Sequence, residues 1–96
     1  MTRYLLRPRA QRDLEEIWTY TARTWSPAQA ETYVRQVQHS CRMIAVDPRL
    51  GRSCDDIRAG YRKFRSGSHF LFYRPIKDGV EIVRILHFSM DFEQHL

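Results

Sequence analysis

Cysteine, glycine, proline and lysine are all scarce in this 96-residue chain. It holds only two cysteines, Cys41 and Cys54, which are too few for the disulfide framework of a small secreted domain. No apolar run approaches the roughly 18 residues of a membrane span, and the apolar part of the N-terminus is too short for a signal peptide. We therefore expect a single cytoplasmic domain over residues 1–96, with no membrane segment.

Arginine supplies nearly all of the positive charge. Of the 16 basic residues 14 are arginine, and the formal net charge is +5. Such an excess favours an acidic partner, either a nucleic acid or an acidic protein. The preference for arginine over lysine is equally consistent with GC-rich codon usage. Six of the basic residues fall between Arg58 and Lys77, a segment without any acid.

A β pattern dominates the second half of the chain, from Gly60 to Asp91. It predicts three strands, at Tyr61–Arg65, Ser68–Ile76 and Val80–Phe88. The pair Asp78-Gly79 predicts a type I′ turn between the last two strands. In the register that this turn sets, Tyr73 faces Arg84 and Phe70 faces His87. Both faces of the ribbon are then substantially apolar, so each needs a cover.

Apolar residues recur at helical spacing in the first half of the chain. One helix is predicted at Pro8–Thr24, with its proline in the first turn. A second begins after Ser26, whose side chain can accept the backbone N–H of Gln29, and it ends at Pro48 and Gly51. Because the link is so short, the two helices run antiparallel as a hairpin.

The predicted fold class is α+β, with the order β-α-α-β-β-β. Thr2–Arg7 is long enough for one edge strand, and Arg52–Arg58 reads as an irregular polar connection. The helical hairpin packs on one face of a mostly antiparallel, four-stranded sheet. What covers the other face is the functional question.

Short motifs spread over nearly the whole chain resemble one family of bacterial toxins. They are A-x-x-D-L-x-x-I-W-x-Y from Ala10, a Trp-Ser-Pro link, Q-A-x-x-Y, P-x-x-G-R, R-x-G-Y-R, G-S-H-x-x-F-Y-R and R-I-L-H-x-S-M-D. Their order and spacing resemble the ParE branch of the RelE/ParE toxins. The resemblance implies a toxin of a bacterial type II toxin–antitoxin system that inhibits DNA gyrase and uses no cofactor.

The resemblance also implies a ParD-like antitoxin, in a hetero-oligomer with the toxin. Its ribbon-helix-helix N-terminus would bind operator DNA, and its acidic, amphipathic C-terminal segment would enter an apolar groove of the toxin. We expect the antitoxin to contact Trp18, Tyr33, Arg58, Arg65, Tyr73 and Arg84. Arg84 interrupts an apolar strand, which is an expensive place for a cation unless a carboxylate or an aromatic ring meets it.

The C-terminal segment Ser89–Leu96 is the expected contact with the target. Either this segment is frayed, as chain termini often are, or its apolar residues pack back on the sheet. In the second case polar groups would face the target, and the residues assigned to it are His87, Met90, Asp91 and Phe92. The competing interpretation of His87 is a core or rim histidine without a role in binding.

A ribosome-dependent mRNA endoribonuclease of the RelE branch is the alternative function. Its candidate groups are Arg62, Lys63, Arg65 and Arg84 as cations, His69 and His87 as acid–base groups, and Tyr73 as a proton donor. The His-Tyr pair of some ribonuclease members is His87-Phe88 here, and Gly60–Phe70 has no glutamate that could act as the base. The sequence therefore predicts no catalytic residues, and the scattered histidines and cysteines predict no metal site.

Overall fold

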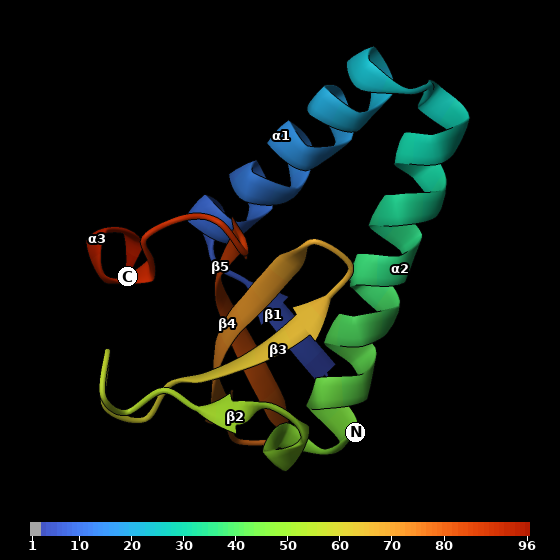
Figure 1. Cartoon of the computed structure of the whole chain (residues 1–96). Helices are drawn as coiled ribbons and strands as arrows, with labels where there is room; N and C mark the ends of the chain where they lie inside the picture. Colours follow the sequence, from blue (N-terminus) through green and yellow to red (C-terminus); the bar gives the residue numbers. More distant parts are fainter. Residues whose placement is uncertain (1–2) are drawn as a thin grey trace.

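The computed structural model describes residues 3–96 and has a five-stranded sheet with a helical hairpin on one face (Figure 1). The elements are β1 (Arg3–Leu6), α1 (Pro8–Thr24), α2 (Pro27–Val46), a 3-10 turn at Pro48–Leu50, β2 (Arg52–Ser53), β3 (Arg62–Ser66), β4 (His69–Ile76), β5 (Gly79–His87) and α3 (Phe92–His95). The predicted α+β class, both long helices and the three main strands are confirmed. Thr2, predicted as part of the edge strand, lies outside the described residues.

Local signals explain where the two long helices begin and end. Pro8 and Pro27 each occupy a first turn, where a missing N–H group is harmless. The Ser26 side chain accepts the backbone N–H of Gln29 at 3.0 Å, which confirms the predicted cap. The link between the helices is so short that they form a hairpin whose tip projects beyond the sheet (Figure 1).

The strands are ordered β1-β5-β4-β3-β2 across the sheet. β1 runs parallel to β5, and the other neighbours are antiparallel. The prediction of four strands is wrong, because part of the segment expected to be irregular forms β2 and pairs with β3. β2 has only two residues, which is too short for a periodicity to show in the sequence.

The hairpin turn between β4 and β5 lies one residue earlier than predicted. Ile76 pairs with Gly79, so the loop residues are Lys77 and Asp78. Of these two, Asp78 alone has a positive φ, at 64°, whereas a type I′ turn needs positive φ at both positions. The predicted type I′ turn at Asp78-Gly79 is therefore wrong.

Gly79 serves the parallel strand rather than the turn. Its φ is 154°, and a Cβ atom there would lie 1.8 Å from the backbone oxygen of Arg3 in β1. Glycine lets the backbones of β1 and β5 approach at this point.

A β-bulge shifts the register between Phe72 and Tyr73, with Val83 as the extra residue on β5. The observed pairs are Tyr73 with Ile82, Phe72 with Arg84, Phe70 with Leu86, and His69 with His87. The predicted pairing of Tyr73 with Arg84, and of Phe70 with His87, is wrong. The apolar pattern of the sequence carries no sign of a bulge. A register counted from the turn alone therefore misses it.

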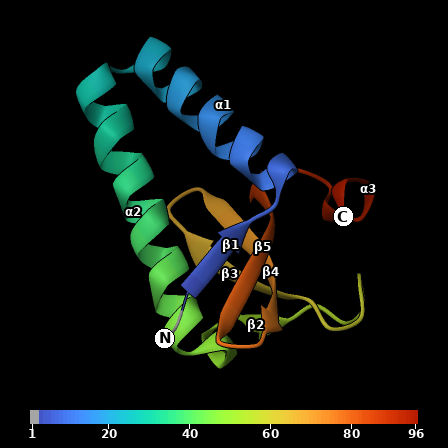
Figure 2. The ribbon, with the colours of Figure 1, turned by 180° about the vertical axis from the view of Figure 1, so that it is seen from behind.

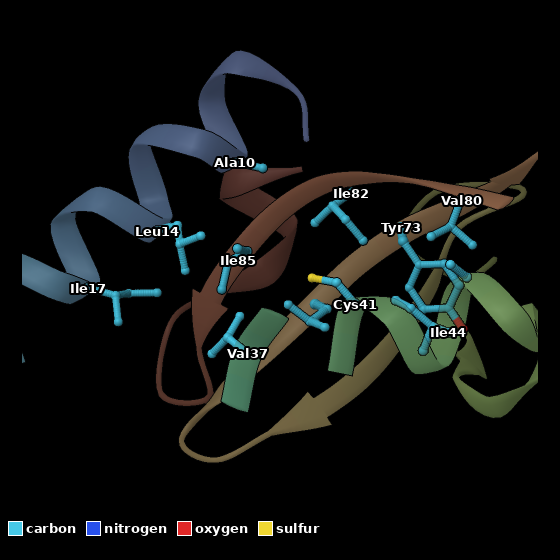
Figure 3. Packing of buried hydrophobic residues seen from close by; sticks show 12 residues of the cluster. Ala10, Leu14, Ile17, Val37, Cys41, Ile44, Tyr73, Val80, Ile82 and Ile85 are labelled. Carbon is cyan, nitrogen blue, oxygen red and sulfur yellow. The ribbon is translucent and has the colours of Figure 1, made fainter. Parts of the chain in front are cut away.

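The helical hairpin covers one face of the sheet with a large apolar core (Figure 3). α1 contributes Ala10, Leu14 and Ile17, and α2 contributes Val37, Cys41, Ile44 and Ala45. The sheet contributes Leu71, Tyr73, Val80, Ile82 and Ile85. The other apolar residues at helical spacing between Ala30 and Ala45 are also covered. Tyr33 and Val34 are partly buried against this core, and Ala30 is fully buried.

The second face of the sheet is covered by the chain itself. Cys54, Phe72 and Leu86 are buried there under the tail residues Met90, Phe92 and Leu96, together with Ile57, Tyr61 and Phe70. α2 and α3 lie on opposite sides of the sheet in both ribbon views (Figures 1 and 2). The expectation that a partner must cover this face is wrong, and the tail is packed rather than frayed.

An aromatic contact and a hydrogen bond are among the interactions that hold the tail in place. The Phe92 ring lies 4.7 Å from that of Phe72, and the Arg58 guanidinium donates to the backbone oxygen of Leu96 at 2.7 Å.

Among residues 3–96 no helix is both long and apolar enough to span a membrane.

Replacing Gly79 with alanine should destabilise the fold because the new Cβ atom meets the Arg3 backbone. We expect a loss of about 3 kcal/mol or more in the free energy of unfolding, measured by urea denaturation. Gly60→Ala is the matched control: Gly60 has a φ of 83°, but a Cβ there meets no atom within 4 Å. This control should lose only about 1–2 kcal/mol. Equal losses for both variants would contradict the close approach of β1.

Candidate functional site

An ion pair between Asp13 and Arg84 anchors α1 to β5. The Arg84 Nε atom donates to Asp13 Oδ2 at 2.7 Å, and Nη2 donates to Oδ1 at 3.0 Å. Both side chains are buried, with residue exposures of 5% and 8%. The backbone N–H of Ile85 also donates to Asp13 Oδ2, at 3.0 Å. Asp13 is therefore the carboxylate that Arg84, a cation in an apolar strand, requires.

This pair lies at the point where β5 loses its neighbour. β1 pairs only with Gly79–Ile82, so the rest of the β5 edge has no strand beside it on that side. Asp13 accepts the Ile85 N–H group, as the carbonyl of a neighbouring strand would. Beyond Ile82 the β5 edge contacts α1, and Val83, Arg84, Ile85 and Leu86 are all buried.

A groove of about 470 Å³ opens beside the ion pair, between the helical hairpin and the ends of β4 and β5. Its aromatic and apolar lining includes Ile17, Tyr20, Trp25, Tyr33, His69 and His87. Tyr20 and Trp25 are 68% and 70% exposed, although both are large aromatic side chains. An exposed aromatic pair beside a groove is typical of a protein interaction site.

Hydrogen bonds fix both histidines of the groove. The Tyr33 hydroxyl accepts the Ser68 backbone N–H at 2.9 Å and lies 2.6 Å from His69 Nδ1. Burial, and secondarily the nearby His87, lower the pKa of His69 to about 4. Burial raises the pKa of Tyr33. At neutral pH His69 is therefore a neutral ring beside a protonated tyrosine.

The structure does not bring the six predicted antitoxin contacts together. Tyr33 and Arg84 line the groove, whereas Trp18 lies outside it and is 38% exposed. Arg58 and Arg65 lie on the second face, the latter 4.8 Å from the Phe88 ring centroid.

Tyr73 is fully buried in the main core. Its hydroxyl donates to the Pro48 carbonyl at 2.6 Å and accepts the Gly51 N–H at 2.9 Å. The expectation that Tyr73 lies on a partner surface is wrong, because the helical hairpin covers its face of the sheet. Arg84 is likewise interior, held by Asp13 and not by an aromatic ring.

The four residues assigned to the target are also divided. His87 and Met90 line the groove, and Met90 also packs on the second face. The Asp91 side chain caps α3 by accepting the Glu93 N–H, and Phe92 packs on Phe72.

Trp25 and Tyr20 are groove residues that sequence reasoning missed. Helical spacing predicts a core position for Trp25, but this residue lies at the C-terminal end of α1, beyond the sheet. Tyr20 lies off the apolar stripe of the helix, so its position in the sequence already indicates an exposed aromatic side chain.

Several ribonuclease candidates are engaged inside the fold. Tyr73 and Arg84 are buried, and Arg62 Nη1 donates to the Gly51 carbonyl at 2.7 Å. Lys63 and Arg65 lie over the Phe70 ring on the second face. Among residues 3–96 no group of three His, Cys, Asp or Glu side chains is arranged to hold a metal ion.

Comparison with known proteins gives one consistent result. Residues 4–92 match the family model described as the ParE toxin of a type II toxin–antitoxin system, parDE. Toxin ParE1 of Mycobacterium tuberculosis is 51% identical over 96 residues, covering 99% of this chain and 98% of the relative. Toxin ParE1 of Caulobacter vibrioides is 46% identical over 96 residues, covering 100% and 99%.

A solved structure, that of a chromosomal ParDE TA system from P. aeruginosa, has a similar fold. It aligns with a TM-score of 0.78, over 91% of this chain and 96% of that one. The sequences are only 17% identical, so the likeness concerns the fold alone.

Removing either member of the buried ion pair should destabilise the protein strongly. We expect Arg84→Met or Asp13→Asn to cost about 3–5 kcal/mol in urea denaturation, because a buried charge loses its partner. The control is Arg74→Met at the Arg74–Glu81 pair, whose side chains are 47% and 21% exposed. That change should cost about 1 kcal/mol or less. A loss at Arg84 no greater than that at Arg74 would show that the pair does not anchor α1.

Proposed function

This chain belongs to the ParE family of type II toxin–antitoxin toxins, and from that membership we propose that it arrests bacterial growth by binding DNA gyrase in the cytoplasm, without covalent chemistry of its own. A ParD-like antitoxin neutralises it in a hetero-oligomer. Operator DNA is bound only through the antitoxin, whose N-terminal part carries the ribbon-helix-helix fold. The P. aeruginosa structure with a similar fold is that of a ParDE system, which supports a partner of this kind.

The groove between the helical hairpin and β5 carries the antitoxin part of the proposal. It offers exposed aromatic side chains, Trp25 and Tyr20, next to the apolar Ile17. An amphipathic segment can bury its apolar face there. The net charge of +5 favours an acidic segment.

The internal bonds of the candidate catalytic groups support a non-enzymatic toxin. A ribonuclease needs a base, an acid and cations that reach a scissile phosphate. Arg84 and Tyr73 are held in the interior, and His69, whose pKa is lowered to about 4, is a weak base at neutral pH.

The exposed side of the C-terminal segment, including Asp91, is the proposed contact with gyrase.

Induction of the protein without its antitoxin should halt DNA replication and trigger a DNA-damage response. Bulk mRNA should stay intact, because Arg84 and Tyr73 are held in the interior and His69 is a weak base at neutral pH. Primer extension on abundant transcripts soon after induction measures this. Codon-positioned cuts at early times would contradict gyrase inhibition and favour the ribonuclease.

Trp25→Ala should weaken antitoxin binding by about 30-fold or more, since a central exposed tryptophan commonly contributes about 2 kcal/mol or more to an interface. Calorimetric titration with the antitoxin measures this affinity. Trp18→Ala is the comparison, because Trp18 is on the same helix but outside the groove. It should change the affinity by less than about fivefold. The reverse order of effects would place the antitoxin on the other side of α1.

A further inference from the structure

We propose that His69 and His87 form a carboxylate-binding pair in the groove, which takes an Asp or Glu side chain of the antitoxin's acidic segment. The two residues are direct partners on β4 and β5. Their rings meet edge to face, with centroids 5.4 Å apart. This inference rests on the proposed binding of the antitoxin in the groove.

The hydrogen-bond network gives both rings the same tautomer. The Ser89 backbone N–H donates to His87 Nδ1 at 3.2 Å, so this nitrogen is an acceptor and carries no proton. The Tyr33 hydroxyl accepts from Ser68, and its own proton has two acceptors in reach, the Ser66 carbonyl at 3.3 Å and His69 Nδ1 at 2.6 Å, of which His69 Nδ1 is the nearer. Donation by that hydroxyl leaves Nδ1 of His69 unprotonated as well. In a neutral ring the proton is then on Nε2, so each histidine presents one Nε2–H donor.

Both Nε2 atoms are open to solvent. No hydrogen bond joins either of them to another of residues 3–96, while every buried side-chain nitrogen or oxygen among those residues has a partner. The two Nε2 atoms are therefore accessible, and both residues line the groove. A carboxylate has two oxygens, each of which can accept an N–H donor of this kind.

No acid among residues 3–96 is hydrogen-bonded to either Nε2 atom. Asp13 accepts three hydrogen bonds, two from Arg84 and one from Ile85. The other charged residues that line the groove, Arg9 and Glu16, are of opposite sign. Formal charges in the groove cancel, so an incoming carboxylate is recognised by the histidine donors and not by net charge.

The carboxylates of Asp91 and of the last residue, Leu96, are used elsewhere. The backbone oxygen of the terminal residue Leu96 accepts from Arg58 on the second face, and Asp91 caps α3. The tail therefore does not supply the occupant, and the antitoxin does. The lowered pKa of His69, about 4, keeps this ring a neutral donor at neutral pH.

Nitrogen-15 NMR of the histidine rings tests the pair with a small probe. Hexanoate offers a carboxylate with an apolar tail, and hexanamide is its neutral isostere. We expect hexanoate to shift the Nε2 signals of His69 and His87, in the Nε2–H tautomer, and hexanamide to leave them unchanged. Equal shifts with both probes, or shifts with zinc chloride but not with hexanoate, would overturn the proposal.

Variants of His87 extend the test to the antitoxin. His87→Gln keeps an N–H donor near the Nε2 position and should bind the antitoxin within about threefold of the wild type. His87→Leu removes the donor and should weaken binding by about ten- to a hundredfold. Equal affinities for both variants would overturn the carboxylate pair. If Trp25→Ala also has no effect, the groove itself is not the antitoxin site, and the hexanoate titration still decides the chemistry of the pair.

Discussion

The ion pair of Asp13 and Arg84 fixes the position of α1, and with it the groove. β1 ends at Leu6, and the N–H of Arg7 makes a last bond to Ile82 before the chain enters α1. Six residues later, Asp13 binds both Arg84 and the N–H of Ile85. The helix is thereby held across the β5 edge beyond β1, and its far end, which Trp25 caps, projects past the sheet (Figure 1).

The same arginine also reaches the C-terminal tail. Arg84 Nη1 donates to the His95 carbonyl at 3.0 Å, so one side chain joins α1, β5 and α3. Burying such a pair yields little net stability, but removing one member is costly. The interaction therefore matters more for where the elements sit than for how stable they are. It places the groove on one side of β5 and the packed tail on the other.

The helices and main strands were predictable because their signals are local: apolar periodicity, a Ser-Pro cap and a break at Pro48. The requirement for a carboxylate near Arg84 was also predictable, since a cation in an apolar strand needs one. Its identity was not, because Asp13 is 71 residues away in the chain. The bulge at Val83 and the folding back of Phe92 depend on tertiary packing that no periodicity records. The helical hairpin covers Tyr73 and the tail covers the second sheet face, so both lie in the interior and not on a partner surface.

Hydrogen exchange of the protein, free and bound to its antitoxin, tests most directly whether the antitoxin occupies the groove beside this ion pair. Amides at the C-terminal end of α1, around Tyr20 to Trp25, and at the end of β5 that lines the groove, from Arg84 to His87, should gain protection on binding. Amides of β2 and β3, on the opposite edge of the sheet, should exchange as in the free protein. Protection confined to β2 and β3, or to the tail Phe92–Leu96, would contradict the account.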